Sequence, residues 1–169
     1  LCQLQGVVHG VNLRPGGLEF AIIDDNKDGI TVFSLNETFG YDPNLGDEVI
    51  VRGAIDQFNG LTQIAVDTIW TVSTGNSLFA PTPVTALGEA TESQLVLLEN
   101  VSLVSPGDWD NSGGSFNFEV TDGTNTYNCR IDSDVDIAGM DAPQSTFNLT
   151  GIGGQFDNSL PYDEGYQLL

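Results

Sequence analysis

Apolar and polar residues alternate along most of this chain with the two-residue period of β-strands. In the first half, runs bounded by Gly, Pro, Asn and Asp predict five strands, at residues 2–12, 17–24, 29–35, 48–58 and 61–72. In the second half the same pattern predicts strands at residues 95–104, 115–121, 126–131 and 146–155, and a last one ending at Leu169. No window carries an apolar stripe of period 3.6 over a helical length, so the chain is predicted to be all-β.

The segment 46–64 carries the most specific local signals. Residues 48–52 alternate as a strand, and Gly53 interrupts the run as a β-bulge or a bend in a barrel would. The pair Asn59-Gly60 is the strongest short signal for a β-hairpin. We therefore expect two strands joined by a tight turn, with a bend at the glycine.

This segment also resembles a known family. Residues 46–53 read G-D-x-V-x-V-x-G and residues 58–64 read F-N-G-x-x-Q-I, which resembles the OB-fold domains of secreted and cell-surface bacterial proteins of the Bacteroidetes type. The segments 147–151 and 165–169 resemble the terminal strands of the same domains. The resemblance implies small five-stranded Greek-key barrels.

The two halves of the chain repeat one plan. Residues 20–25 align with residues 118–123, and each of these segments leads into a predicted hairpin. The segment between the halves is rich in Gly, Ser, Thr and Pro. We therefore predict two tandem five-stranded OB-fold-like Greek-key barrels, at residues 1–74 and 94–169, joined by a linker at residues 75–93.

Charge excludes one class of partner. Four Lys and Arg against 24 Asp and Glu give a net charge of −20, and this field repels the phosphates of nucleic acids. No run of about 18 apolar residues is present, so no membrane span is predicted. Scarce Lys, an acidic surface and a first residue Leu1 that already lies in a strand-like run favour an extracellular protein excised from a longer chain.

A first candidate calcium site is the loop 24–29. Asp24, Asn26 and Asp28 place oxygen side chains at alternate positions before a glycine, as in the opening half of a calcium loop. The twelfth position holds Leu35 instead of Glu, which excludes an EF-hand. The alternative is an ordinary Asp-Gly hairpin turn.

A second candidate calcium site follows the same spacing. Asp108, Asp110 and Ser112 alternate, and Glu119 falls on the twelfth position. A solvated acidic loop is the alternative, and within it Trp109 is expected to be an exposed aromatic that contacts a partner or a glycan. Two further acidic groups are interpreted as solvated loops; they are Asp132, Asp134 and Asp136, and Asp157, Asp163 and Glu164.

Catalytic constellations are poorly supported. His9 is the only histidine and lies in a strand-like run, and no carboxylate pair stands out, so we predict that the protein is not an enzyme. Cys2 and Cys129 have no zinc spacing. They either form a disulfide, within or between subunits, or are two buried thiols.

These features predict a non-catalytic extracellular structural protein that binds calcium and polymerises head to tail into a cell-surface fibre or adhesive array. The alternative is an accessory OB-fold module of a larger secreted enzyme that binds glycan or single-stranded nucleic acid. Net charge opposes nucleic acid as the ligand and leaves glycans open.

Overall fold

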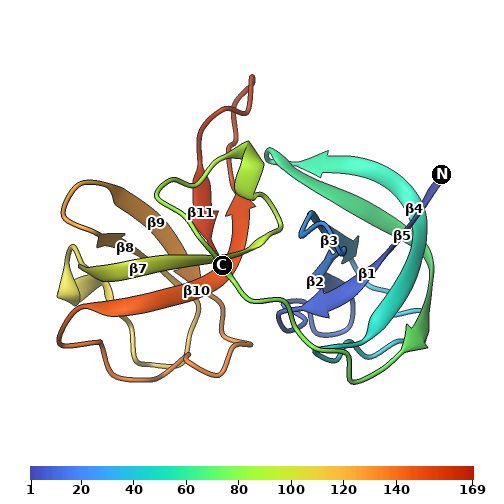
Figure 1. Ribbon diagram of the computed structural model, residues 1–169, viewed down its shortest axis with the longest axis horizontal. Coiled ribbons are helices and arrows are strands. Elements are labelled where there is room, and N and C mark those ends of the chain that lie inside the picture. The colour runs from blue at the N-terminus through green and yellow to red at the C-terminus, as the bar shows by residue number, and fades with distance from the viewer.

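The computed structural model describes residues 1–169 and is built almost entirely of β-strands (Figure 1). The elements in chain order are β1 (Cys2–His9), β2 (Leu18–Ile23), β3 (Gly29–Ser34), β4 (Glu48–Phe58), β5 (Leu61–Ser73), β6 (Thr82–Pro83), the short 3-10 helix η1 (Glu89–Thr91), β7 (Leu95–Leu103), η2 (Pro106–Asp108), β8 (Phe116–Thr121), β9 (Thr126–Ile131), β10 (Phe147–Gln155) and β11 (Tyr166–Leu168). The all-β prediction is confirmed, and ten predicted strands have counterparts at closely matching positions.

Strands β1–β5 form a closed barrel, called barrel 1 here. Its strand order is β1-β2-β3-β5-β4, and β4 returns to pair with β1. All pairings are antiparallel except β3 with β5. Alternate side chains point inward and fill one apolar core, which includes Val8, Phe20, Val32, Val51 and Ile64.

Strands β7–β11, called barrel 2 here, follow the same connectivity. β7 pairs with β8, β8 with β9, β9 in parallel with β11, β11 with β10, and β10 with β7. The β7–β8 contact is short, because only Ser102 and Leu103 of β7 are in register with β8. A second apolar core fills this barrel, so the fold is two tandem OB-like barrels, side by side in Figure 1.

The hairpin of β4 and β5 follows the local signals of the sequence. The register of the two strands shifts between Arg52 and Gly53, which makes the β-bulge predicted at the glycine. At the tip, Asn59 and Gly60 both have positive φ, at 48° and 93°, as a type I′ turn requires. The hairpin therefore bends and reaches toward barrel 2.

The connecting segment 74–94 packs against both barrels. It adds β6, which pairs in parallel with β7. Ser93 is buried, and its Oγ lies 3.0 Å from Oγ1 of Thr31 on β3. The backbone N–H of Thr62 donates to Oε1 of Glu92 at 3.1 Å. The segment is therefore bonded to barrel 1 just before it enters barrel 2.

The tip of the β4–β5 hairpin docks on the loop that joins β10 and β11. The N–H of Asp157 donates to the carbonyl of Asn59 at 2.7 Å. The Gln155 side chain is buried against Gly60, and its Nε2 donates to the carbonyls of Tyr162 and Glu164 at 2.9 and 2.8 Å. This contact ties the two barrels together at a second place.

Replacing Gly60 with Ala is expected to break this contact. A Cβ at position 60 would overlap the Gln155 amide, and φ of 93° strains any residue that has a Cβ. We expect Gly60→Ala to lower the free energy of unfolding by about 2–4 kcal/mol, measured by urea denaturation.

Gly123→Ala is the matched control for this experiment. Gly123 has nearly the same φ, 90°, but its added Cβ would meet nothing within 4 Å. The substitution is expected to lower the free energy of unfolding only through backbone strain, by about 1–2 kcal/mol. Equal losses in the two variants would show that the Gly60–Gln155 contact does not stabilise the protein.

Candidate functional site

The outer surface of barrel 2 carries a continuous set of polar side chains. Along β8 and β9, Phe118, Val120 and Cys129 point into the core, so the residues between them point outward. The outward set, called the polar face here, consists of Asn117, Glu119, Asn128, Arg130 and Gln167. In register, Asn128 lies between Glu119 of β8 and Gln167 of β11, and Asn117 lies beside Arg130.

The corresponding surface of barrel 1 is covered. Outward positions on β2, β3 and β5 are held by Ala21, Thr31 and Gln63, which are neighbours in the register and are all buried. The connecting segment lies on part of this surface, and Ile152 and Leu169 of barrel 2 approach Ala21 and Thr31 around a small void. Only barrel 2 therefore presents this part of its sheet to solvent.

A groove runs across the polar face. Two adjoining hollows of about 310 and 440 Å³ share Asn117, Phe156 and Gln167 as lining residues. The first extends to Asp108 and Glu119, and the second extends to barrel 1. Together they form one groove with an outer half on barrel 2 and an inner half between the barrels, within the size range of ligand sites.

Several groups in the groove have no partner inside the protein. The side chains of Glu119, Asn128 and Gln167 make no hydrogen bond within the chain, in contrast to most of the amides in its turns. Phe156 stands at the rim and is 52% exposed, and Phe58 of barrel 1 is 59% exposed beside the inner half. The groove thus combines unused donors and acceptors with apolar ring surface.

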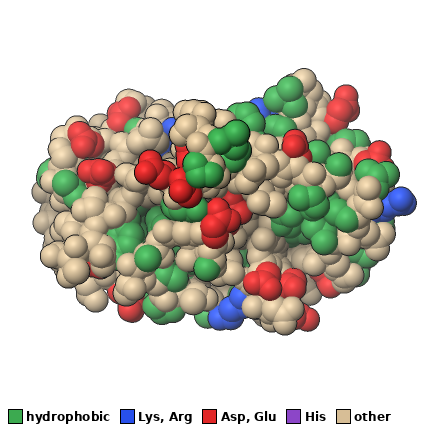
Figure 2. Space-filling view, turned by 90° about the horizontal axis from the view of Figure 1, so that it is seen from above, with side chains coloured by type: hydrophobic (Ala, Val, Ile, Leu, Met, Phe, Trp, Pro, Cys, Tyr) green, Lys and Arg blue, Asp and Glu red, His purple; other side chains and the backbone are tan.

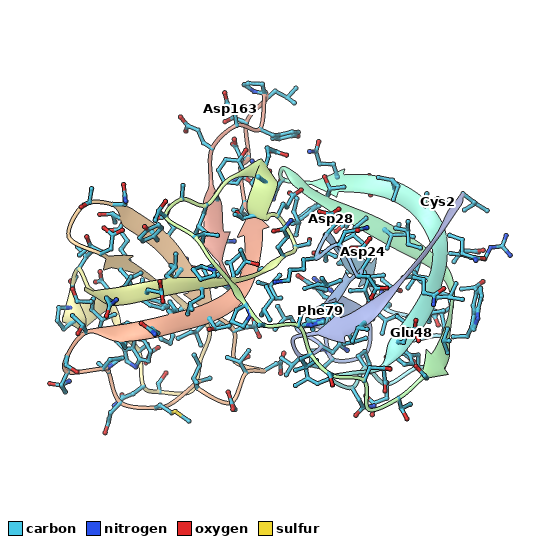
Figure 3. All side chains as sticks on the ribbon, in the orientation of Figure 1. Cys2, Asp24, Asp28, Glu48, Phe79 and Asp163 are labelled. Carbon is cyan, nitrogen blue, oxygen red and sulfur yellow. The ribbon has the colours of Figure 1, made fainter.

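The loop 156–165 forms one wall of the groove and projects from the molecule, where Asp163 marks it in Figure 3. Asp157 organises it, since its Oδ1 accepts bonds from the N–H and Oγ of Ser159 and its Oδ2 from the N–H of Glu164. These donors hold the pKa of the Asp157 carboxyl below its usual range, the N–H of Ser159 contributing most. Asp157 is thus a structural residue of the groove wall.

The first candidate calcium loop lies between β2 and β3. Oδ1 of Asp24 accepts bonds from the N–H groups of Asn26 and Asp28 at 2.8 and 3.1 Å, and Oδ2 accepts one from Nδ2 of Asn26. In barrel 2, Asp122 caps the equivalent β8–β9 turn in the same way. Figure 3 shows Asp24 and Asp28 on barrel 1, on the side toward barrel 2.

The second candidate loop is divided between two places. Asp108 and Glu119 line the outer half of the groove together. Oδ1 of Asp110 accepts a bond from the N–H of Ser112 at 2.8 Å, which lowers the pKa of Asp110, and neither residue lines the groove. The first and twelfth positions of the loop therefore line the same hollow, and the middle two lie on a separate turn.

Trp109 is not the exposed aromatic that the sequence predicts. Its ring packs edge-on against Phe116 and Phe118, with centroids 5.3 and 5.2 Å apart, and its Nε1 donates to the carbonyl of Met140 at 2.8 Å. The loop after β7 folds back over the core and packs the Trp109 ring against it. The exposed rings of the groove are instead Phe58 and Phe156, which the sequence does not distinguish from the phenylalanines of the cores.

No group of three or more His, Cys, Asp or Glu side chains is arranged to hold a metal ion. Among the other acidic groups, Asp132 accepts a bond from Ser115 and lies 3.9 Å from Arg130. Burial, together with the neighbouring Asp132, raises the pKa of Asp134. Calcium binding stays a prediction from the loop spacing.

The two cysteines are free thiols and lie in different barrels. Cys2 is half-buried at the outer end of barrel 1, as Figure 3 shows, while Cys129 is buried in the core of barrel 2. Burial raises the pKa of the Cys129 thiol to about 12. The two thiols are not bonded to each other in this structure, and a disulfide between subunits stays a prediction.

His9 has a structural role at the end of β1. It is buried, its Nδ1 bonds to the carbonyl of Val7, and its Nε2 accepts the N–H of Phe79 at 3.0 Å. Its ring stacks on Phe79 with centroids 5.2 Å apart. Nδ1 orients the ring on β1 and Nε2 fixes the connecting segment on barrel 1, so neither nitrogen is free to transfer a proton.

Comparisons with protein-family models, with curated proteins and with solved structures gave no match. The helices of the structure are single 3-10 turns, and none is long and apolar enough to cross a membrane.

The calcium prediction can be tested on stability. If the loops bind calcium, the ion at about 100 times its dissociation constant adds about 2.7 kcal/mol to the free energy of unfolding, and the melting temperature rises. Asp28→Asn and Asp108→Asn, one in each loop, identify which of them contributes. Equal shifts with magnesium at the same ionic strength would show general screening of the acidic surface and contradict a calcium site.

Stability is expected to fall in mild acid because of His9. Burial lowers its pKa below the ordinary 6.5, so the unfolded chain takes up a proton that the fold excludes. The contribution of His9 to stability is constant above about pH 7.5 and falls as pH drops through 6.5, by about 1.4 kcal/mol per unit of pKa difference. Urea denaturation at pH 7.5 and 5.5 measures this slope, and His9→Gln should remove its share.

Proposed function

We propose that the protein is a non-catalytic binding module whose ligand is a glycan, held in the groove of barrel 2. The observation that supports this proposal most directly is that one barrel leaves an amide-rich face and a ring open while its twin buries the same surface. The two barrels have the same strand connectivity, but only barrel 2 exposes this face. This difference fits a division of roles in which barrel 1 is a support and barrel 2 binds the ligand.

The chemistry of the groove suits a polyhydroxylated ligand. Asn128 and Gln167 each offer two N–H donors and a carbonyl acceptor, and Glu119 offers two acceptor oxygens. A sugar presents adjacent hydroxyl groups that donate and accept at once, so it matches such mixed sets. The apolar face of a sugar ring can pack on Phe156, which is already exposed.

Charge disfavours single-stranded nucleic acid as the ligand. OB-type faces that bind single strands combine stacking rings with a positively charged track for the backbone. Here the net charge is −20, and Figure 2 shows acidic side chains over both halves with few basic ones among them. The phosphate backbone of a nucleic acid would gain little binding free energy from this surface.

The calcium-dependent fibre subunit, the first function that the sequence predicts, stays a prediction, as does the extracellular location. Its support is the spacing of the acidic loops and the tandem barrels. Filaments seen by negative-stain microscopy in calcium, and lost after chelation without any ligand, would favour the fibre over the binding module.

The groove is tested by binding of the full chain to a glycan array, followed by calorimetry on the ligands found. Asn128→Ala and Gln167→Ala are each expected to weaken binding roughly tenfold, because each leaves ligand hydroxyls without a partner. Chelator should leave the affinity unchanged.

Gln144→Ala is the control for these variants. Gln144 is an exposed amide in the loop between β9 and β10 and does not line the groove. The affinity of the Gln144→Ala variant for the glycan should equal that of the unmodified protein. An array without any bound glycan, or equal effects of all three variants, would overturn the proposal.

A further inference from the structure

Two of the four basic residues of the chain lie in the inner half of the groove. Arg14 comes from the loop after β1 in barrel 1, and Arg130 comes from β9 in barrel 2. Neither of the other two basic residues, Lys27 and Arg52, lines it. The packing of the barrels thus gathers scarce positive charge at one place.

Arg14 is held in a fixed position and keeps N–H donors that no group of the protein uses. Its Nε donates to Oε2 of Glu19 at 3.0 Å, its Nη2 lies 2.9 Å from the same oxygen as an ion pair, and its guanidinium lies 5.0 Å over the Phe33 ring. No hydrogen bond uses its Nη1 within the protein. The side chain remains 35% exposed, so its remaining N–H groups are open to the groove.

Arg130 is positioned in a comparable way. Its Nη1 donates to Oδ1 of Asn117 at 3.1 Å, and its Nη2 lies 3.9 Å from Oδ2 of Asp132. The side chain is 37% exposed, and its Nε has no partner. Each arginine therefore has one neighbouring carboxylate and keeps part of its donor set for a ligand.

From this placement we propose that the ligand is an acidic glycan whose carboxylate binds between Arg14 and Arg130. A guanidinium presents paired N–H groups that match a carboxylate in geometry and charge. The inference rests on the proposed function and specifies its ligand class. Specificity then depends on both barrels, because each supplies one arginine.

The outer half of the groove sets the direction of the ligand. Asp108 and Glu119 line it without any basic residue, so a carboxylate there would meet repulsion. Neutral hydroxyl groups suit this half, where Asn128 and Gln167 lie. The acidic unit therefore belongs at the inner half, beside barrel 1.

The test compares two probes: an oligouronate, and the same oligosaccharide with its carboxylates reduced to alcohols. Calorimetry should show at least tenfold tighter binding of the oligouronate. Arg14→Gln and Arg130→Gln should each remove most of this difference while leaving affinity for the reduced probe nearly unchanged. Retained binding of the reduced probe also shows that the variant groove is folded.

Arg52→Gln is the control, since it changes the net charge equally and lies on β4 away from the groove. Equal affinity for the two probes, or a loss in Arg52→Gln as large as in the groove variants, would overturn the acidic-glycan inference. Binding of neutral glycans alone would overturn it and leave the proposed function standing. Binding of neither probe nor any array glycan would overturn both.

Discussion

The inner half of the groove exists because the two barrels are packed in one fixed arrangement. Barrel 1 buries its outer surface at Ala21 and Thr31 under the connecting segment and barrel 2. The same packing carries Arg14 to the wall of the inner half. At the other side, the bond from Asp157 to Asn59 and the contact of Gln155 with Gly60 fix the loop 156–165 against the β4–β5 hairpin. Losing these contacts would separate the two walls of the inner half, which come from different barrels.

The fold could be predicted from sequence because its signals are local. Alternation identifies strands, Gly53 marks the bulge, and Asn59-Gly60 specifies the turn, and each of these needs only a few neighbouring residues. The aligned segments 20–25 and 118–123 fold alike, with Phe20 and Phe118 both in barrel cores. These local features agree with the global fold, as expected of a foldable sequence.

The site could not be predicted in the same way, because it depends on pairings between distant strands. Asn128 and Gln167 become neighbours only through the parallel pairing of β9 with β11. Whether an outward residue is exposed depends on what covers the barrel, which explains why Thr31 is buried and Asn128 is not. Trp109 is the opposite case: it lies in an acidic loop, where exposure is expected, but its ring packs on the core. The available signal was that residues 119–121, E-V-T, alternate polar and apolar, whereas the aligned residues 21–23 read A-I-I.

Net charge and local charge act on different scales in this protein. The charge of −20 disfavours a long polyphosphate, which must lie close to many carboxylates along its length. A single carboxylate is governed by the groups within a Debye length, about 8 Å at physiological ionic strength, because exposed charges farther away are screened. Within the inner half, Glu19 and Asp132 offset the two arginines and hold them in place, so neither guanidinium must reorganise before a ligand binds. An acidic protein can therefore select a carboxylate at one site while its surface as a whole excludes nucleic acid.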